Sequence, residues 1–254
     1  MQFVEFITDK NAIIFILLFA RISGVFAFFP FFNYVTIPIS IKTALALYLT
    51  FLFFPDISTL DVSLDISSLT LAILSELMLG FISALALMLV FAALQLAGMQ
   101  ISMVMGFSMS TIFDPSSGST VPIMSQFFTI LAILMLLAFD GHHMILVFLS
   151  KSFSSINLGG FVATKNMWEY LSKEVTNMFV VGFLISFPVI ALSLLADIIF
   201  GMLMKTMPQF NLLVVGFPIK IFLSFMVLTA VLGSILLIFK KEFMIAFNFL
   251  KNLI

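Results

Sequence analysis

Ionisable side chains stand inside stretches that are otherwise apolar, and the residues most able to do chemistry are Arg21, Glu76, Asp140, Asp197 and Lys220. A charged group at the centre of a bilayer costs ~2.5–3.5 kcal/mol on insertion scales, so each one is expected to face protein, water or an interface. Two uses follow for such groups. They either line a polar path for ions or protons, or they form ion pairs that hold helices together.

The most suggestive cluster is the run Asp-Gly-His-His at residues 140–143. Asp140 and His143 are three residues apart and can meet on a helix. Adjacent histidines on a helix point about 100° apart, so His142 and His143 are not expected to bind one ion together. Zinc takes three or four protein ligands, and no further ligand is near in the sequence. We therefore expect a helix-breaking polar turn in which Asp140 caps backbone donors, with no metal site and no cofactor.

The other charges are best interpreted as structural or interface groups. Asp197 and Lys220 are expected to pair across two helices, while Arg21 is expected to pair either with Glu76 or with another subunit. The alternative is a secondary transporter that relays protons through Asp140, His143, Asp197 and Lys220. Such transporters are built from internal repeats, and the sequence has no clear repeat.

No enzyme is indicated by the motifs. The sequence has no phosphate-binding glycine loop ending in Lys-Ser or Lys-Thr, which argues against ATP hydrolysis. Asp140 and Asp197 lack the Gly-x-Gly-Asp setting that an intramembrane aspartyl protease would require. The net charge of -1 offers no basic footprint for nucleic acid, and the absence of cysteine excludes a disulfide framework.

The elements that must position these residues are apolar helices. Of the 254 residues 63% are hydrophobic and 9% are charged, against roughly 25% charged in soluble domains. Lipid or apolar subunits must therefore cover much of the chain. Six apolar runs are visible, each too long and too uniformly apolar for a barrel strand; they cover residues 12–32, 39–54, 69–94, 123–149, 178–204 and 212–239.

The fold class predicted from these runs is all-α. We expect an integral membrane-type protein of Pro-broken helical hairpins with nominally six hydrophobic helical segments, forming a single domain over residues 1–254. The second run has only 16 residues between Pro38 and Pro55, which is short for a membrane span. Short runs, prolines and internal charges suggest hairpins packed against partner subunits rather than simple spans.

One segment, residues 95–122, carries the mechanistic hypothesis. Gly98, Ser102, Gly106 and Ser110 recur every four residues, which on a helix makes a smooth stripe for close packing. The run from Asp114 onward is then turn and loop chemistry. Ordinary helix packing followed by a surface loop would explain this pattern. The sharper hypothesis is a compliant pore plug, in which Met and Phe seal and Gly and Ser yield; its candidate residues are Met103, Met105, Gly106, Phe107, Met109, Phe113, Asp114, Pro115 and Gly118.

Four blocks of the sequence, in order, resemble a known family. Residues 106–115 (Gly-Phe-Ser-Met-Ser-Thr-Ile-Phe-Asp-Pro) resemble a signature of the FliR family of flagellar export proteins, which includes the matching subunit of virulence type III secretion systems. The other blocks are Arg-Ile-Ser-Gly at 21–24, Phe-Asp-Gly-His-His at 139–143, and Pro-Gln-Phe-Asn at 208–211 followed by Gly-Phe-Pro-Ile-Lys at 216–220. The resemblance extends over essentially the whole chain.

This resemblance implies a function beyond what the residues alone indicate. It implies a core subunit of the flagellar type III export gate, in the bacterial inner membrane and the flagellar basal body. FliP-like and FliQ-like subunits and other export-apparatus membrane proteins would be its partners. Unfolded flagellar proteins would pass through the gate, and the loop over about residues 106–122 would plug the pore. The gate itself would not be an enzyme and would need no cofactor.

Overall fold

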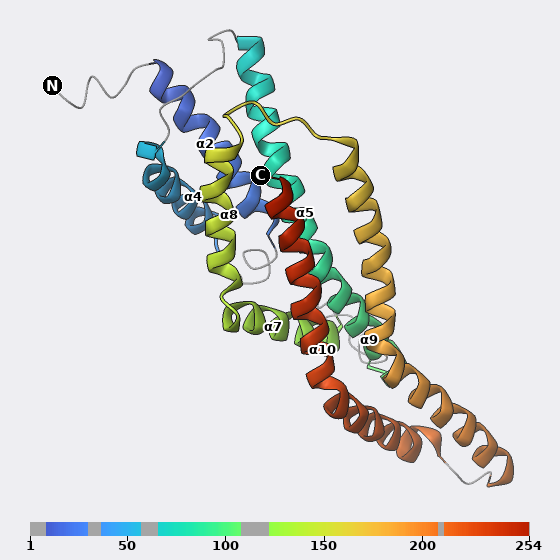
Figure 1. Ribbon diagram of the computed structural model, residues 1–254. Helices are drawn as coiled ribbons and strands as arrows, with labels where there is room; N and C mark the ends of the chain where they lie inside the picture. The colour runs from blue at the N-terminus through green and yellow to red at the C-terminus, as the bar shows by residue number, and fades with distance from the viewer. Residues whose placement is uncertain (1–8, 30–36, 57–65, 108–121, 208–210, 254) are drawn as a thin grey trace. The chain divides into compact units, whose positions relative to one another are not determined.

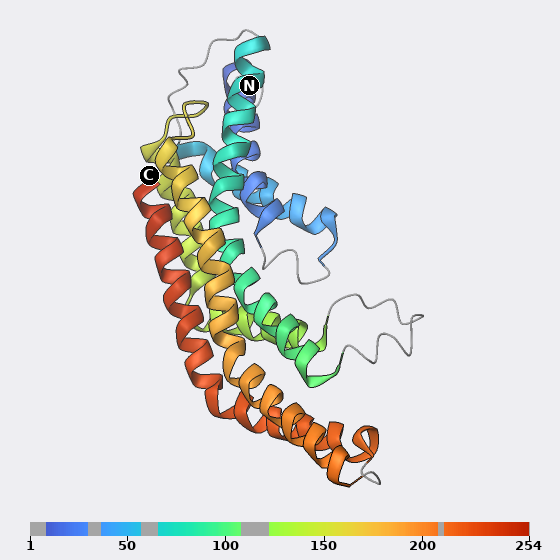
Figure 2. The ribbon, with the colours of Figure 1, turned by 90° about the vertical axis from the view of Figure 1, so that its right-hand side faces the viewer.

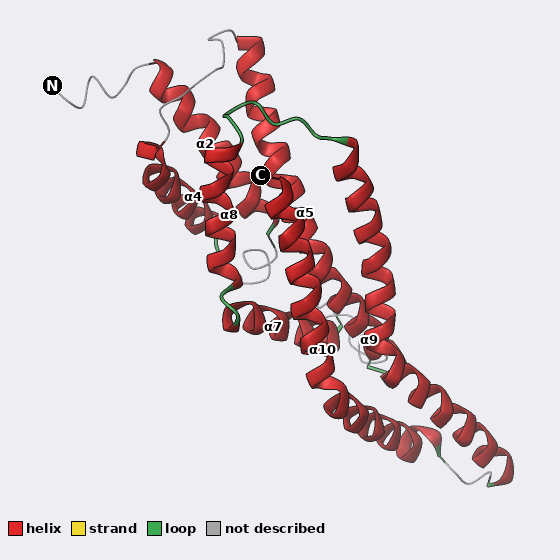
Figure 3. Ribbon diagram, in the orientation of Figure 1, coloured by secondary structure: helices red, strands yellow, loops and turns green. Residues whose placement is uncertain are grey.

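The structure of the chain is a computed structural model, and it describes residues 9–29, 37–56, 66–107, 122–207 and 211–253. Throughout these ranges the regular structure is helical, and they contain no strand (Figure 3). The all-α fold class predicted from the length and uniformity of the apolar runs is therefore confirmed.

The helices follow the order of the apolar runs (Figure 1). Each of the six runs becomes at least one helix, and the fourth becomes two. The elements are α2 (Asp9–Phe28), α4 (Ile39–Phe53), the short 3-10 turn η1 (Phe54–Asp56), α5 (Ile66–Met105), α7 (Ile123–Ala138), α8 (Gly141–Ser155), α9 (Lys165–Thr206), the π-helical turn η3 (Leu212–Gly216) and α10 (Phe217–Leu253).

Helix length separates the elements that can cross a bilayer from those that cannot. Within the described ranges, α2, α5, α9 and α10 are long and apolar enough to span, and the broken pair α7–α8 would make a fifth span. The remaining apolar helix, α4, has 15 residues, fewer than the ~20 that a bilayer core requires. The short second run is therefore a short helix, as its flanking prolines predicted.

Proline does not break every helix in which it occurs. Pro38 is the residue before α4 and Pro55 lies in the turn after it, as expected of a residue that lacks a backbone N–H. Pro188, by contrast, lies inside α9, which runs for 42 residues without interruption. Prolines therefore flank the short helix α4, whereas Pro188, which lies within the predicted apolar run 178–204, is contained in a continuous helix.

The described chain divides into two compact units. Unit 1 comprises residues 1–89, 137–174 and 243–254, and unit 2 comprises residues 90–136 and 175–242. Helices α5, α9 and α10 each contribute residues to both units. The ionisable groups are divided in the same way, because Arg21, Glu76 and Asp140 belong to unit 1 whereas Asp197 and Lys220 belong to unit 2.

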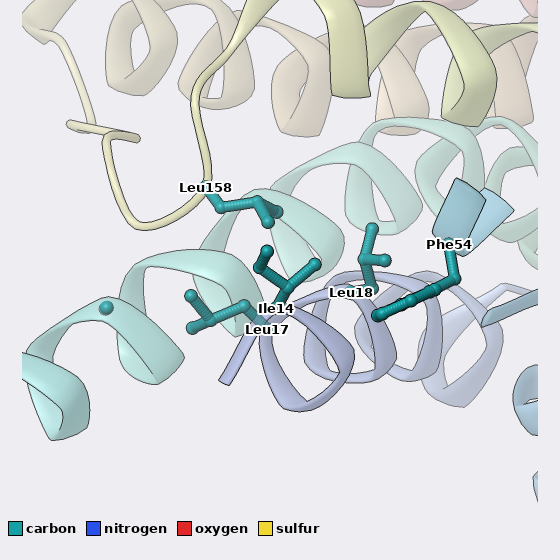
Figure 4. Packing of buried hydrophobic residues seen from close by; sticks show 6 residues of the cluster. Ile14, Leu17, Leu18, Phe54 and Leu158 are labelled. Atoms are coloured by element: carbon teal, nitrogen blue, oxygen red, sulfur yellow. The ribbon is translucent and has the colours of Figure 1, made fainter. Parts of the chain in front are cut away.

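The core of unit 1 is formed on the buried face of α2. Ile14, Leu17 and Leu18 are at most 2% exposed and pack with Phe54, Ala72 and Leu158 (Figure 4). Burying an aliphatic or aromatic side chain of this size contributes roughly 1.5–3 kcal/mol. The cluster therefore joins α2 to η1, to the start of α5 and to the turn that follows α8.

In unit 2, residues 175–206 of α9 and 217–242 of α10 lie side by side (Figure 2). Their outer faces expose large apolar side chains, among them Leu184, Ile198 and Phe222, each at least 60% exposed. In the most apolar windows of α9 and α10 only 28% and 17% of residues are buried, against 61% in α5. Apolar surface of this extent requires a covering of lipid or of other protein.

Candidate functional site: buried ion pairs and the end of α5

A buried ion pair joins α2 to α5 in unit 1. Arg21 and Glu76 are both fully buried, and the guanidinium faces the carboxylate in a two-point arrangement: Nε donates to Oε2, and Nη2 donates to Oε1 at 2.9 Å. The same guanidinium donates to the carbonyl oxygens of Ser152 at 2.7 Å and Ile156 at 3.2 Å. Glu76 Oε1 also accepts the backbone N–H of Gly159 at 2.6 Å.

This network satisfies both charges inside the chain. A buried charge is tolerated when it is paired and its remaining hydrogen-bonding groups are used, as they are here. Glycines let the two helices come together: a Cβ on Gly80 would lie 2.8 Å from Val25 N and 2.9 Å from Arg21 O. The sequence left the partner of Arg21 open between Glu76 and another subunit, and in the structure that partner is Glu76.

A second ion pair lies between α9 and α10 in unit 2. Lys220 Nζ donates to Asp197 Oδ1 at 2.7 Å and to Oδ2 at 2.8 Å. The lysine side chain is 9% exposed and the aspartate 53%. One helical turn away on both helices, the hydroxyls of Ser193 and Ser224 are 3.3 Å apart. The pairing predicted across two helices is thus present, with the lysine buried and the aspartate half exposed.

The Asp-Gly-His-His run breaks the fourth apolar run between α7 and α8. Asp140 takes the left-handed conformation at φ 58° and occupies the N-cap position of α8, but its side chain makes no capping hydrogen bond. The carboxylate lies instead 3.3 Å from His143 Nδ1. The predicted helix break and the meeting of Asp140 with His143 are found, whereas the predicted capping by Asp140 is wrong.

The two histidines also lie closer together than the sequence suggested. The ring centroids of His142 and His143 are 4.1 Å apart. One potential ligand atom from each of Asp140, His142 and His143 lies within 4.8 Å of the others. The expected divergence of about 100° assumes that both side chains project radially from a regular helix. At the first turn of α8 their rotamers instead bring the rings together.

The first two members of the small-residue stripe on α5 pack against α7. A Cβ on Gly98 would lie 2.5 Å from Ser125 Cα, so only glycine fits. Ser102 Oγ accepts the backbone N–H of Met124 at 3.1 Å, and Ser125 Oγ donates to Gln95 O at 3.1 Å. At Gly98 and Ser102 the stripe therefore permits close helix packing within the chain, one of the two readings that the sequence left open.

The third member of the stripe, Gly106, has a different use, because α5 ends at Met105. Gly106 has φ 87°, its N–H donates to Met103 O at 3.2 Å, and the N–H of Phe107 donates to Ser102 O at 3.1 Å. These two bonds form a Schellman motif, in which a left-handed residue closes a helix. The expectation of a helical stripe continuing through Gly106 is therefore wrong, and Ser110 lies outside the described residues.

The candidate plug residues are only partly within the described chain. Met103 is 66% exposed, Met105 is fully buried in unit 2, and Gly106 and Phe107 are half-buried. The ring of Phe107 lies 6.3 Å from that of Phe225 in an edge-on arrangement. The other candidates lie outside the described residues; they are Met109, Phe113, Asp114, Pro115 and Gly118.

Sequence reasoning missed several contacts that position α9. Asn177 Nδ2 donates to Glu242 Oε2 at 2.8 Å, and Ser186 Oγ donates to Gln100 Oε1. A Cβ on Gly182 would lie 3.0 Å from Ala93 O, so this glycine permits close approach of α9 and α5. The available signal was the occurrence of Gly182 and Ser186 within the apolar run 178–204; the other three hydrogen-bonding residues lie outside the apolar runs.

Comparison with known proteins accounts for the four sequence blocks together. The chain matches the family described as bacterial export proteins, family 1, over residues 12–245, a range that contains all four. The chain belongs to this family, the FliR family of export proteins. It is 32% identical to the flagellar biosynthetic protein FliR of Bacillus subtilis over 245 residues, which cover 94% of each chain.

More partial matches come from other bacteria. The chain is 33% identical to the FliR of Pectobacterium carotovorum over 56% of this chain and 55% of that protein. It is 29% identical to the FliR of Escherichia coli over 64% and 62%. Membership of the FliR family makes the chain a component of a flagellar protein export apparatus, and its long apolar helices fit a multi-pass inner-membrane protein.

Proposed function

We propose that this FliR-family chain is a core subunit of a flagellar-type export gate. Together with FliP-like and FliQ-like subunits it forms the channel through which unfolded flagellar proteins cross the inner membrane at the basal body. The observation that carries the proposal is the family match over residues 12–245, on a chain with a largely uncovered apolar surface. In this role residues 1–254 act as one subunit, without catalytic chemistry.

The distribution of charge supports a packing role. Arg21 is neutralised by Glu76, and Lys220 by Asp197, within the chain itself. The surfaces left over on α4, α9 and α10 are therefore mainly apolar, as sister subunits or lipid would require. The competing transporter hypothesis needs Asp197 and Lys220 free to bind and release a proton or solute, but in the structure they are bonded to each other.

The pore plug is proposed for residues 106–122. Gly106 ends α5 in a left-handed turn, so the chain leaves the helix axis where the Ser- and Gly-rich segment begins. Met103, which precedes this turn and is exposed, and Phe107, which follows the glycine, are compliant apolar side chains suited to sealing. A plug of this composition closes a channel without a fixed shape and yields when a polypeptide passes.

The test is deletion of residues 116–120 from the chain in its native apparatus. We expect the inner membrane to leak small ions while the protein still assembles, because the seal is shortened. Ion leak is measured in cells by collapse of a potential-sensitive dye signal, and export by secretion of flagellar subunits. A deletion of equal length at residues 59–63, in the acidic segment between α4 and α5, serves as the control.

Two results would contradict the proposal separately. Unchanged permeability together with normal export after deletion of residues 116–120 would contradict the assignment of residues 106–122 as a pore plug. Purification of the tagged chain in mild detergent as a monomer, without FliP-like or FliQ-like proteins, would remove the gate-subunit assignment itself.

A further inference from the structure

The first turn of α8 brings together three side chains that the export function does not use. Asp140, His142 and His143 each offer one ligand atom, and within the described part of the chain they form the single group of three or more His, Asp or Glu side chains close enough to hold a metal ion. All three belong to unit 1 and lie within four consecutive residues. The relative positions of the three side chains therefore depend on this short segment of unit 1 alone.

The spacing of the donors approaches that of a metal site. Zn²⁺ binds imidazole nitrogen and carboxylate oxygen at about 2.0–2.2 Å, so two ligands of a tetrahedral ion lie roughly 3.3 Å apart. Asp140 Oδ1 and His143 Nδ1 are already 3.3 Å apart. The third ligand atom, from His142, lies within 4.8 Å of both.

The side chains of Asp140 and His143 are little engaged by the fold. The side chains of His143 and Asp140 are 66% and 73% exposed, and their shared contact is the one that an ion would replace. His142 Nδ1 is buried and has no hydrogen-bond partner among the described residues. A buried imidazole nitrogen without a partner carries a desolvation cost, which a bound ion would offset.

A sharp backbone turn accompanies the convergence of these three side chains. The left-handed conformation of Asp140, at φ 58°, turns the chain sharply into α8. One potential ligand atom of the carboxylate and one of each first-turn histidine lie within 4.8 Å of one another. Aspartate and asparagine are among the few residues other than glycine that adopt this conformation.

We propose that Asp140, His142 and His143 bind one divalent transition-metal ion of the Zn²⁺ class. The ion takes two imidazole nitrogens and one carboxylate oxygen from the chain, and solvent completes its coordination. Imidazole selects Zn²⁺, Ni²⁺ and Cu²⁺ over Mg²⁺ and Ca²⁺, which prefer sites made wholly of oxygen. The bound ion ties the N-cap residue Asp140 to the first turn of α8.

The test uses the full chain, purified in mild detergent through a tag that contains no histidine. Isothermal titration with Zn²⁺ is expected to show one site per chain, with no comparable heat from Mg²⁺. Replacing Zn²⁺ with Co²⁺ is expected to give the visible absorption of a four-coordinate nitrogen–oxygen site. His143→Ala and Asp140→Asn are each expected to weaken Zn²⁺ binding by at least about tenfold, by analogy with the loss seen when even supporting groups of metal sites are removed.

The control matches the chemistry of the test. Glu169→Gln removes an exposed carboxylate from a helical pair with Lys165, elsewhere in unit 1, and is expected to leave Zn²⁺ binding unchanged. Asn tolerates the left-handed conformation, so Asp140→Asn keeps the turn. Absence of Zn²⁺ binding to the wild-type chain would overturn the proposal, and so would an affinity in Asp140→Asn equal to that of the Glu169→Gln control.

Discussion

Replacing Gly106 by alanine tests whether the end of α5 depends on a left-handed residue. Gly106 has φ 87°, and an added Cβ would meet the ring of Phe217 at 3.0 and 3.2 Å. Gly233, in the interior of α10, provides the same chemical change without either constraint, because nothing lies within 4 Å of a Cβ built there. Both positions belong to unit 2.

The two substitutions should have opposite effects on the free energy of unfolding. A left-handed conformation costs alanine about 1–2 kcal/mol, and the Phe217 ring can move aside with little further cost. Alanine at Gly233 should stabilise the helix by roughly 0.5–1 kcal/mol, because it restricts the unfolded backbone. The two variants should therefore differ by about 1.5–3 kcal/mol, or roughly 3–10 °C in Tm for a chain of this size.

Thermal unfolding of each variant in the same detergent, followed by far-UV circular dichroism, provides the measurement. Gly106→Ala should melt below the wild-type chain and Gly233→Ala at or above it. Equal melting temperatures for the two variants would refute the assignment of Gly106 as the closing residue of α5.

Two further predictions use the same assay. Gly98→Ala should lower the melting temperature at least as much as Gly106→Ala. The added Cβ would lie 2.5 Å from the backbone of Ser125, and overpacking of this kind costs about 1–3 kcal/mol. A neutral effect would show that α5 and α7 do not pack at this point. Arg21→Met should destabilise unit 1 by about 3–5 kcal/mol by leaving the buried carboxylate of Glu76 unpaired, and the double variant Arg21→Met, Glu76→Leu should recover most of that loss. A double variant no more stable than the single one would show that the cost lies in packing rather than in charge.

The sequence predicted the existence of the helices better than the residues at which they begin and end. Hydropathy identifies residues compatible with lipid, and each of the six apolar runs became helical. It could not show that α9 begins at Lys165 in a charged segment, where Lys165 and Glu169 stand four residues apart and pair at 3.6 Å. Nor could it show that α9 continues through Pro188, because tolerance of an internal proline depends on which neighbours satisfy the freed carbonyl.

An ion pair could be predicted from the sequence where each charged residue had few possible partners. Asp197 and Lys220 were the ionisable residues within two successive apolar runs, so their pairing followed. The partner of Arg21 stayed open because it lies 55 residues away, and spacing carries no information over that distance. Gly106 was misassigned because a spacing of four also fits a helix that stops there. The convergence of His142 and His143 depends on side-chain rotamers, which no spacing rule reports.

The pairing of Arg21 with Glu76 sets an order for biosynthesis. Arg21 leaves the ribosome 55 residues before Glu76, and the carbonyls of Ser152 and Ile156 follow only after α8 has been made. Until Glu76 has been synthesised, α2 carries an uncompensated cation. Inserting that cation at mid-membrane would cost ~2.5–3.5 kcal/mol. The first helix should therefore wait at the interface or in the insertion machinery, and enter its final position together with α5 as a neutral pair.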